Sequence, residues 1–293
     1  MIYLVKFFLW LLYLMPAGMP YWLSEKGAGL LMRMSPVKRH TAERNLERCY
    51  PELSSRERDR MVRASFQHYL CSVLESGHNW YWSPEKLGSH CDGIINRDLF
   101  EEARASGKGF ICLAPHFGAW EYLGILLQEI GDVAILYKPP SNPGLDKALQ
   151  ERRRRGGGAL IPATTTGLIQ LYTNLLAGKA AGVLTDQQPP AGKGLFIPFF
   201  GIPALTSDLV PRLAKRADCN VFAAVCERFR GGRFLVHLLP ADPEIFSDDL
   251  TIALTAMNRT IERCIAIDPD QYLWSYRRFK AQPEGVAPFY DFR

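Results

Sequence analysis

The chain lacks the short signatures of the common cofactor and nucleophile sites. It has no Gly-x-Gly-x-x-Gly fingerprint and no Gly-x-x-x-x-Gly-Lys-[Ser/Thr] segment, so neither a Rossmann dinucleotide site nor a Walker phosphate loop is supported. A Gly-x-Ser-x-Gly elbow is also absent, which argues against the serine triad of an α/β-hydrolase. The six histidines are scattered without the spacing of zinc ligands. We therefore expect neither a cofactor nor a metal ion.

The sequence also lacks paired-cysteine motifs and a large net charge. The seven cysteines are odd in number and form no Cys-x-x-Cys, which favours free thiols in a reducing compartment. A mean hydropathy of −0.09 excludes a polytopic membrane protein. The net charge of +5 suits an anionic partner such as a phospholipid, a phosphorylated lipid or an acidic carrier protein. Aromatic and basic residues do not interleave as in an RNA-binding sheet, so we expect no nucleic-acid partner.

The N-terminal segment is the most apolar part of the chain. Residues 1–24 carry a single charge, Lys6, and 7–24 are uncharged over nearly the length that spans a bilayer. Pro16 and Pro20 interrupt this run, so it could either span the membrane or lie in its interface. Basic residues follow it, which by the positive-inside rule puts the rest of the chain on the cytoplasmic face. We predict a membrane anchor over 1–24 and a globular domain over 25–293.

The globular part alternates between two hydrophobic patterns. Apolar strand-like runs occur at 109–114, 132–137, 158–161, 180–184, 195–199, 220–226 and 233–238. Helical spacing occurs at 54–77 and near 119–130, 143–154, 164–177, 206–217 and 248–267. This alternation predicts an α/β fold with a mixed, mostly parallel central sheet flanked by helices. In such sheets the site forms at the carboxyl ends of the strands.

One of those strand ends carries a histidine followed by a carboxylate. His116 comes directly after the run 110–114, and Glu121 follows five residues later. Two residues that far apart on one helix do not share a face, so we place His116 in a loop and Glu121 in the first turns of the next helix. Gly118 would ease the chain through the turn. Histidine is the natural base near neutral pH, and a carboxylate on its other nitrogen would orient it. A structural histidine beside a solvated glutamate remains the alternative.

Further candidates lie at or near other strand ends. Candidate substrate-binding residues are Arg153 and Arg155, in a run of four arginines before three glycines, together with Lys138 and Asp186. The three cations could hold substrate phosphates. A solvated face or a turn explains each of these residues about equally well. The apolar stretch 194–201 is either a core strand or the wall of an acyl-chain pocket, whose lining would be Trp120, Phe196, Phe199 and Phe200. The aromatic and basic segment 271–280 suits a membrane interface or an amphipathic terminus.

These motifs together resemble a known family. The segment His116–Glu121 is similar to the His-x4-[Asp/Glu] motif of membrane acyltransferases. The ordered set across 1–285 resembles the late acyltransferases of lipid A biosynthesis, the lauroyl and myristoyl transferases. It comprises RNLERCYPEL (44–53), YKPPSN (137–142), the arginine and glycine run (152–158), TDQQ (185–188), GLFIPFFGIPALT (194–206) and QYLWSYRRFK (271–280). Two departures are Ala119, where Asn is frequent, and a single Asn after Tyr137.

The resemblance implies a monomeric enzyme of the bacterial inner membrane with its catalytic domain on the cytoplasmic face. It implies acyl transfer from acyl carrier protein, or occasionally acyl-CoA, to a hydroxyl on a 3-hydroxyacyl chain of a lipid A precursor. His116 matches the family's base, Glu121 its partner, Arg155 or Arg153 its important arginine, and Asp186 an acidic position after a strand. Backbone N–H groups at the helix start after His116 are candidate donors to the oxyanion.

Other functions remain open at this point. One is acyl transfer to a glycerolipid or to a glycosylated phosphoinositide, which uses the same pair of residues. Another is a membrane-bound lipid-binding protein without catalysis. Because the chain has no nucleophile elbow, we expect direct attack by the acceptor without a covalent enzyme intermediate.

Overall fold

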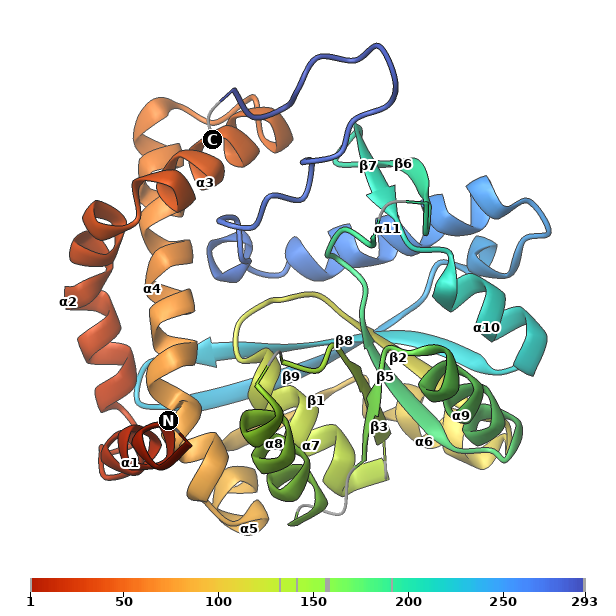
Figure 1. Cartoon of the computed structure of the whole chain (residues 1–293), viewed down its shortest axis with the longest axis horizontal. Coiled ribbons are helices and arrows are strands. Elements are labelled where there is room, and N and C mark those ends of the chain that lie inside the picture. Colours follow the sequence, from red (N-terminus) through yellow and green to blue (C-terminus); the bar gives the residue numbers. More distant parts are fainter. Residues whose placement is uncertain (1, 132, 141, 156–158, 191, 292–293) are drawn as a thin grey trace.

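The computed structural model describes residues 2–131, 133–140, 142–155, 159–190 and 192–291 (Figure 1). The strands are β1 (Cys91–Ile95), β2 (Phe110–Ala114), β3 (Val133–Tyr137), β4 (Leu160–Pro162), β5 (Ala180–Leu184), β6 (Leu195–Phe199), β7 (Ile202–Thr206), β8 (Asn220–Phe229) and β9 (Arg233–Pro240). The α-helices are α1 (Ile2–Tyr13), α2 (Met19–Met34), α3 (Pro36–Cys49), α4 (Ser55–Tyr81), α5 (Pro84–Gly88), α6 (Arg97–Ala105), α7 (Trp120–Gly131), α8 (Pro143–Arg155), α9 (Thr165–Leu176), α10 (Leu209–Ala217) and α11 (Leu250–Ile265).

Seven of the strands form one sheet in the order β1-β9-β8-β2-β5-β3-β4. Its neighbouring strands are parallel except for β8 and β9, which form an antiparallel pair. The predicted α/β class with a mixed, mostly parallel sheet is therefore confirmed. The run at 195–199 does not join this sheet, because β6 pairs with β7 in a separate antiparallel hairpin.

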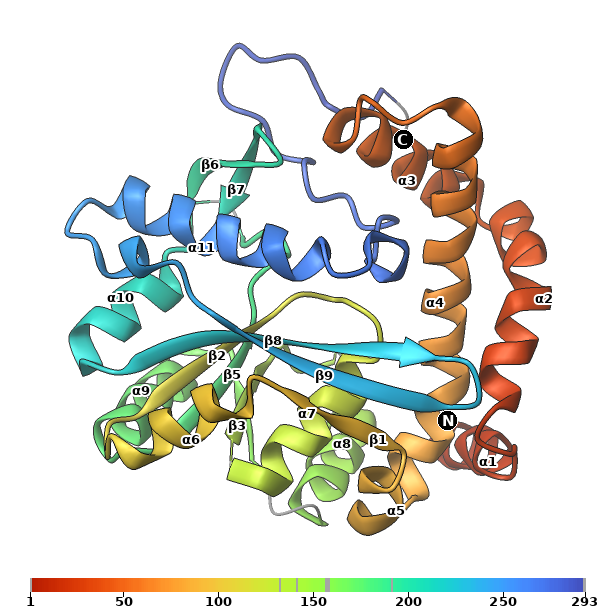
Figure 2. The same ribbon diagram turned by 180° about the vertical axis from the view of Figure 1, so that it is seen from behind.

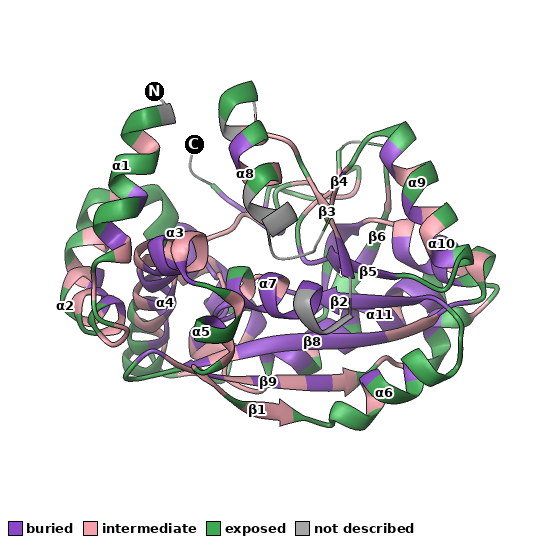
Figure 3. Cartoon of the chain, turned by 90° about the horizontal axis from the view of Figure 1, so that it is seen from below, coloured by how far each residue is buried: buried purple, intermediate pink, exposed green. Residues whose placement is uncertain are grey.

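The central strands are buried on both faces. In β2, Ile111 and Leu113 point into a core shared with α10 and α11, while Phe110 and Cys112 point into a second core shared with α5, α6 and α7. Figure 2 shows these two helical layers on opposite sides of the sheet. Figure 3 shows the burial concentrated in β2, β5 and β8 and decreasing toward the edge strand β1. A strand covered on both faces has a continuous apolar sequence. The runs expected at 109–114 and 180–184 therefore agree closely with the bounds of β2 and β5.

Helices α1, α2 and α4 form a third layer at one end of the sheet (Figure 1). Helix α4 begins with a capping box in which Ser54 and Glu57 exchange hydrogen bonds. Helix α1 packs closely against α4 at Gly77, where a Cβ atom would lie 2.3 Å from the backbone nitrogen of Tyr13. The N-terminal helices therefore pack on the body of the protein through specific contacts.

The N-terminal anchoring helix expected over 1–24 is not supported. The chain leaves α1 after Tyr13 and re-forms a helix at Met19, with Pro20 in its first turn, so the boundary expected at residue 24 falls inside α2. Within the described ranges, no helix has both the length and the apolar character needed to cross a bilayer. The two prolines that interrupt the apolar run explain the break, because neither is compatible with a continuous helix interior.

Candidate active site

His116 lies in a loop at the carboxyl end of β2, and Asp186 lies at the carboxyl end of β5. The two strands are parallel neighbours, and their register pairs Ala114 with Leu184. His116 and Asp186 each stand two residues beyond that pair, so the register brings them side by side. The backbone N–H of Thr185 donates to the Ala114 carbonyl at 3.3 Å and extends the pairing past the strands. The strand-end placement predicted for His116 is confirmed.

Asp186 holds His116 at two points. Its Oδ1 lies 2.8 Å from His116 Nδ1, and its Oδ2 accepts the backbone N–H of His116 at 2.9 Å. The carboxylate is almost fully buried, while the imidazole keeps 15 % of its side-chain surface exposed. Because a carboxylate only accepts, the proton of this bond sits on Nδ1, and in the neutral ring Nε2 keeps its lone pair. The exposed nitrogen is thus the one able to act as a base.

The pair is electrostatically coupled. Burial alone would lower the pKa of His116, but the charge and hydrogen bond of Asp186 and the charge of Glu121 outweigh it and raise that pKa. Burial likewise pushes the pKa of Asp186 upward, but the charge and hydrogen bonds of His116, with a contribution from the charge of Arg278, bring it below its usual value. Asp186 is therefore an anion at neutral pH, and it stabilises the imidazolium that forms when His116 takes a proton.

Glu121 lies where the sequence placed it but in a different relation to the histidine. It is the second residue of α7 and is exposed. The carboxylate hydrogen-bonded to His116 Nδ1 belongs to Asp186, whereas Glu121 acts on the pKa of the ring as a nearby charge. Asp186, predicted as a substrate ligand, is the residue hydrogen-bonded to His116. Its role toward the substrate stays a prediction. The catalytic role assigned to Glu121 stays a prediction.

The loop between His116 and α7 is fixed by backbone contacts. Gly118 has φ = +53°, and a Cβ there would lie 2.1 Å from the carbonyl oxygen of Cys226, so the expected glycine turn is confirmed. The N–H groups of Phe117, Gly118 and Ala119 donate at 2.8–3.0 Å to the carbonyls of Pro115, Gln271 and Cys226. These three N–H groups are therefore not available to donate to an oxyanion. Of the backbone donors expected after His116, the N–H groups in the first turn of α7 remain as candidates.

A buried arginine supports the same loop from behind, and sequence reasoning missed it. Arg228 on β8 forms a bidentate pair with Glu75 of α4, with both distances at 2.8 Å, and donates from Nη2 to the Gly118 carbonyl at 2.9 Å. The side chain of Arg228 has no exposed surface. In the sequence, Arg228 is visible only as a charged residue near the end of a predicted buried strand. That pattern does not indicate that Glu75 is its partner.

The C-terminal segment closes the other side of the site. The backbone N–H of Leu273 donates to the His116 carbonyl at 3.1 Å, and the Tyr276 hydroxyl accepts the N–H of Gln188 at 3.0 Å. Trp274 and Arg278 are buried, and Arg278 donates to the Leu205 carbonyl at 2.6 Å. Several rings of 271–280 and its second arginine therefore pack inward, which does not support the interpretation of this segment as a membrane interface.

Of the other predicted substrate-binding residues, Lys138 lies at the same edge of the sheet. Lys138 follows β3 directly and is exposed. The register that pairs Ile135 with Gly182 brings it level with Thr185. Arg153 and Arg155 belong to the last turn of α8, where their side chains lie outside the described residues. The substrate-binding roles of these three cations stay predictions.

The four residues expected to line an acyl pocket do not share one environment. Trp120 opens α7, with its ring centroid 5.6 Å from that of His116, and Phe196 is partly exposed on β6. Phe199 is buried and packs against Phe279 in the core. Phe200 contacts the rings of Tyr50 and Trp274. Trp120 is thus the member placed beside the base, while Phe199 is a core residue.

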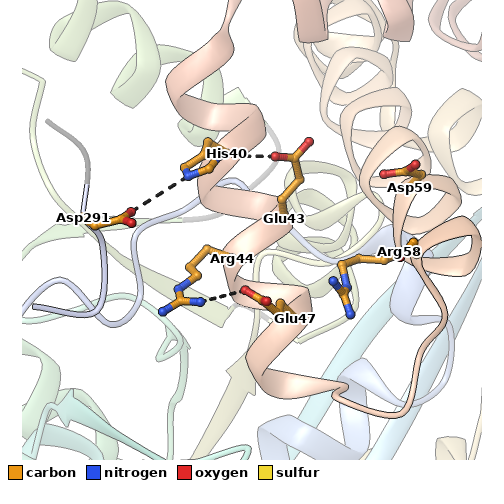
Figure 4. Close-up of a pocket in the computed structure, with 8 residues that line it drawn as sticks. His40, Glu43, Arg44, Glu47, Arg58, Asp59 and Asp291 are labelled. Carbon is orange, nitrogen blue, oxygen red and sulfur yellow. Dashed lines mark hydrogen bonds and ion pairs between the residues drawn. The ribbon is translucent and has the colours of Figure 1, made fainter.

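A separate polar pocket of about 380 Å³ lies between α3, the start of α4 and the C-terminal segment (Figure 4). Its charges pair with one another: Arg44 with Glu47, and His40 with Glu43 and with Asp291. None of its lining residues belongs to the strand-end site. Its four carboxylates outnumber its two arginines, which gives it no evident role in recognising an anionic substrate.

The fold and the strand-end pair define an α/β protein in which His116 keeps an exposed nitrogen able to accept a proton. Comparison with known proteins identifies the family. The chain belongs to the bacterial lipid A biosynthesis acyltransferases, whose family model matches residues 1–281. This confirms the resemblance carried by the motifs.

Several characterised members align over most of the chain. It is 28 % identical to the lipid A biosynthesis lauroyltransferase of Escherichia coli strain K12, over 96 % of this chain and 92 % of the relative. Identity is 25 % with the palmitoleoyltransferase of the same strain, with the same coverage of both chains. It is 27 % with the myristoyltransferase, over 88 % of this chain and 80 % of the relative. Family membership makes the reaction class acyl transfer in lipid A biosynthesis.

Proposed function

We propose that this protein transfers a fatty acyl chain from a carrier-protein thioester to a hydroxyl on a 3-hydroxyacyl chain of a lipid A precursor. The observation that supports this most directly is the bond of 2.8 Å between His116 Nδ1 and Asp186. It fixes the tautomer whose Nε2 accepts a proton. His116 removes the proton of the acceptor hydroxyl as its oxygen attacks the thioester carbonyl, which contributes about 10²–10⁴-fold to the rate.

The remaining charges support the same reaction. Asp186 orients the base, and Glu121 adds a second negative charge that favours the imidazolium. Lys138 lies at the carboxyl edge of the sheet, where it would hold phosphates of the acceptor or of the carrier's prosthetic group, and Arg153 and Arg155 on α8 are further candidates for this role. A thiolate is a good leaving group, so the acceptor attacks directly and no acyl-enzyme forms.

The experiment is mass spectrometry of the lipid product. Purified protein is mixed with a lipid A precursor and a panel of carrier-protein and coenzyme A thioesters, with His116→Ala in parallel. We expect a mass gain of one acyl group that is lost in the variant and is larger with the carrier thioester. No gain on lipid A, together with a gain on a glycerolipid or a glycosylated phosphoinositide, would reassign the acceptor. No gain on any lipid would favour the non-catalytic lipid-binding protein.

We further propose that α1 and α2 lie in the surface of the bacterial inner membrane, with the catalytic part on its cytoplasmic side. Both helices pack on α4. Their exposed large apolar side chains are Tyr3, Leu4, Phe7, Phe8, Trp10, Leu11, Met19, Trp22, Leu30 and Met34. Monomeric soluble proteins rarely expose large apolar patches, so this concentration of exposed apolar side chains favours a membrane-facing role. In-plane helices with aromatic residues and basic neighbours bind the headgroup boundary in this way.

Vesicle flotation tests this surface. Trp10→Glu should reduce the bound fraction on anionic vesicles by about tenfold, because burying an aromatic ring in an apolar phase is worth roughly 1.5–3 kcal/mol. Ile169→Glu, which changes an even more exposed apolar residue on α9, is the control and should leave binding unchanged. Equal loss in both variants would show that charge rather than this surface controls binding.

A further inference from the structure

The side chain of Gln187 occupies the position that the acceptor hydroxyl needs. Its Nε2 lies 3.1 Å from His116 Nε2, the nitrogen that serves as the base. A group that gives its proton to a histidine must approach that nitrogen to about 2.6–3.2 Å. The amide and the acceptor therefore compete for one lone pair, and the amide must move when the acceptor binds.

The backbone around Gln187 is fixed although its side chain is exposed. Asp186 before it is buried and bonded to His116. Gln188 after it donates its N–H to the Tyr276 hydroxyl, and its Oε1 accepts the N–H of Ala281 at 2.9 Å. The Gln187 side chain therefore pivots from a fixed point next to the base. Its torsions can turn the amide a few ångströms without moving the loop.

The direction of the resting hydrogen bond follows from the ring tautomer. With its proton on Nδ1 toward Asp186, neutral His116 offers only a lone pair at Nε2, so the Gln187 atom facing it is the N–H donor. Attack on the thioester creates a negative oxygen that needs such a donor. The N–H groups of Phe117, Gly118 and Ala119 are already engaged by carbonyls.

We propose that Gln187 is a catalytic residue whose amide donates to His116 Nε2 in the resting protein and to the thioester carbonyl oxygen during the reaction. This inference rests on the proposed acyl transfer. The acceptor proton passes to His116 Nε2, the new C–O bond forms, and the carbonyl electron pair moves onto the oxygen held by Gln187. On collapse the C–S bond breaks, and the departing thiolate takes the proton from His116.

The groups that set the charge around His116 must be kept constant in the test. Asp186 faces Nδ1, Glu121 contributes its charge from α7, and Arg278 influences the ring through Asp186. None of these groups is changed by substitution at Gln187. A change in the pKa of His116 in Gln187→Ala can therefore be assigned to the amide, whereas Gln187→Glu adds a charge of its own and is compared by its kinetics alone.

The experiment combines steady-state kinetics with an NMR titration of His116 in the purified full-length protein, using a carrier-protein thioester and a lipid A precursor. Gln187→Ala removes the amide, and Gln187→Glu keeps its size but not its N–H donor. Both should lower kcat by about 10²–10³-fold while KM changes less than threefold, as expected for a lost oxyanion donor. Gln170→Ala, an exposed glutamine on α9, is the surface control.

The titration reports on the resting contact independently of turnover. Because the amide stabilises the neutral ring, Gln187→Ala should raise the pKa of His116. A kcat within threefold of wild type, or an unchanged pKa of His116, overturns the proposal. If wild type transfers no acyl group, the proposed function fails and this inference with it. That case is distinguishable, because a failure of the Gln187 proposal alone leaves wild type fully active.

Discussion

Replacing Asp186 by asparagine tests which carboxylate controls the base. The substitution keeps the size of the side chain and an oxygen that can accept from His116 Nδ1, but it removes the negative charge. Asparagine can also present its N–H₂ group to the ring and favour the wrong tautomer. We expect transfer to collapse while the fold persists, because the change is nearly isosteric.

The magnitude follows from the two contacts. A hydrogen bond to a charged group is worth about 1.5–3 kcal/mol, so losing the charge-assisted bond at 2.8 Å costs roughly 10–150-fold in rate. In the Ser-His-Asp triad of serine proteases the equivalent substitution costs about 10⁴-fold, because the ring is also held in the wrong tautomer. We therefore expect kcat to fall by about 10²–10⁴-fold for Asp186→Asn. KM should change little, since Asp186 is almost fully buried.

The assay is the pH dependence of kcat/KM beside an NMR titration of His116. Asp186 raises the pKa of the histidine, so Asp186→Asn should lower it and move the acid limb of the profile to lower pH. Glu121→Gln should lower the same pKa by less, because its charge is the smaller contribution. If Asp186→Asn kept the wild-type rate and pKa while Glu121→Gln lost both, the assignment of the orienting carboxylate would be refuted. Loss of activity in Glu121→Gln with an unchanged pKa would place Glu121 on the substrate.

Two further predictions concern the support of the loop. Gly118→Ala should destabilise the protein by about 1–3 kcal/mol in denaturant titrations and impair transfer, because it adds both left-handed strain and a clash with Cys226. Gly201→Ala, at φ = +74° with open space around it, isolates the strain and should cost less. Arg228→Met should cost about 3–5 kcal/mol by leaving Glu75 buried without its partner. Adding Glu75→Leu should restore much of that stability, and a double variant no more stable than the single one would argue against an uncompensated charge.

The sequence predicts the buried central strands well, but it does not predict the edge strand β1 or the hairpin strand β7. The runs at 109–114 and 180–184 correspond closely to β2 and β5, because burial on both faces leaves a local apolar signal. The edge strand β1 was missed because it is only partly buried and carries Asp92 and Gly93. The strand β7 was not predicted, since a short hairpin strand has too few residues to show a period of two.

The same limit explains the site. A motif such as His116 to Glu121 is local, so it is visible in the sequence. Whether β5 or β3 lies beside β2 depends on the crossovers of the whole sheet, and no local pattern encodes it. Asp186 was therefore recognised as a residue at a strand end, but its bond to the histidine could not be derived. Arg228 was missed for the same reason, because its partner Glu75 lies on a helix 153 residues away.

The register of the parallel strands connects these observations into one argument about function. It aligns the carboxyl ends of β2, β5 and β3, so the base, its orienting carboxylate and Lys138 occupy consecutive positions along one edge. A substrate that lies along this edge would meet His116 at its reacting hydroxyl and a cation two strands away. An acceptor with a phosphate at some distance from the hydroxyl suits that spacing, and a phosphorylated glycolipid has this form. Shifting either strand by one residue would turn His116 or Asp186 to the opposite face and separate the pair. The chemistry therefore depends on the pairing of Ala114 with Leu184 as much as on the two side chains themselves.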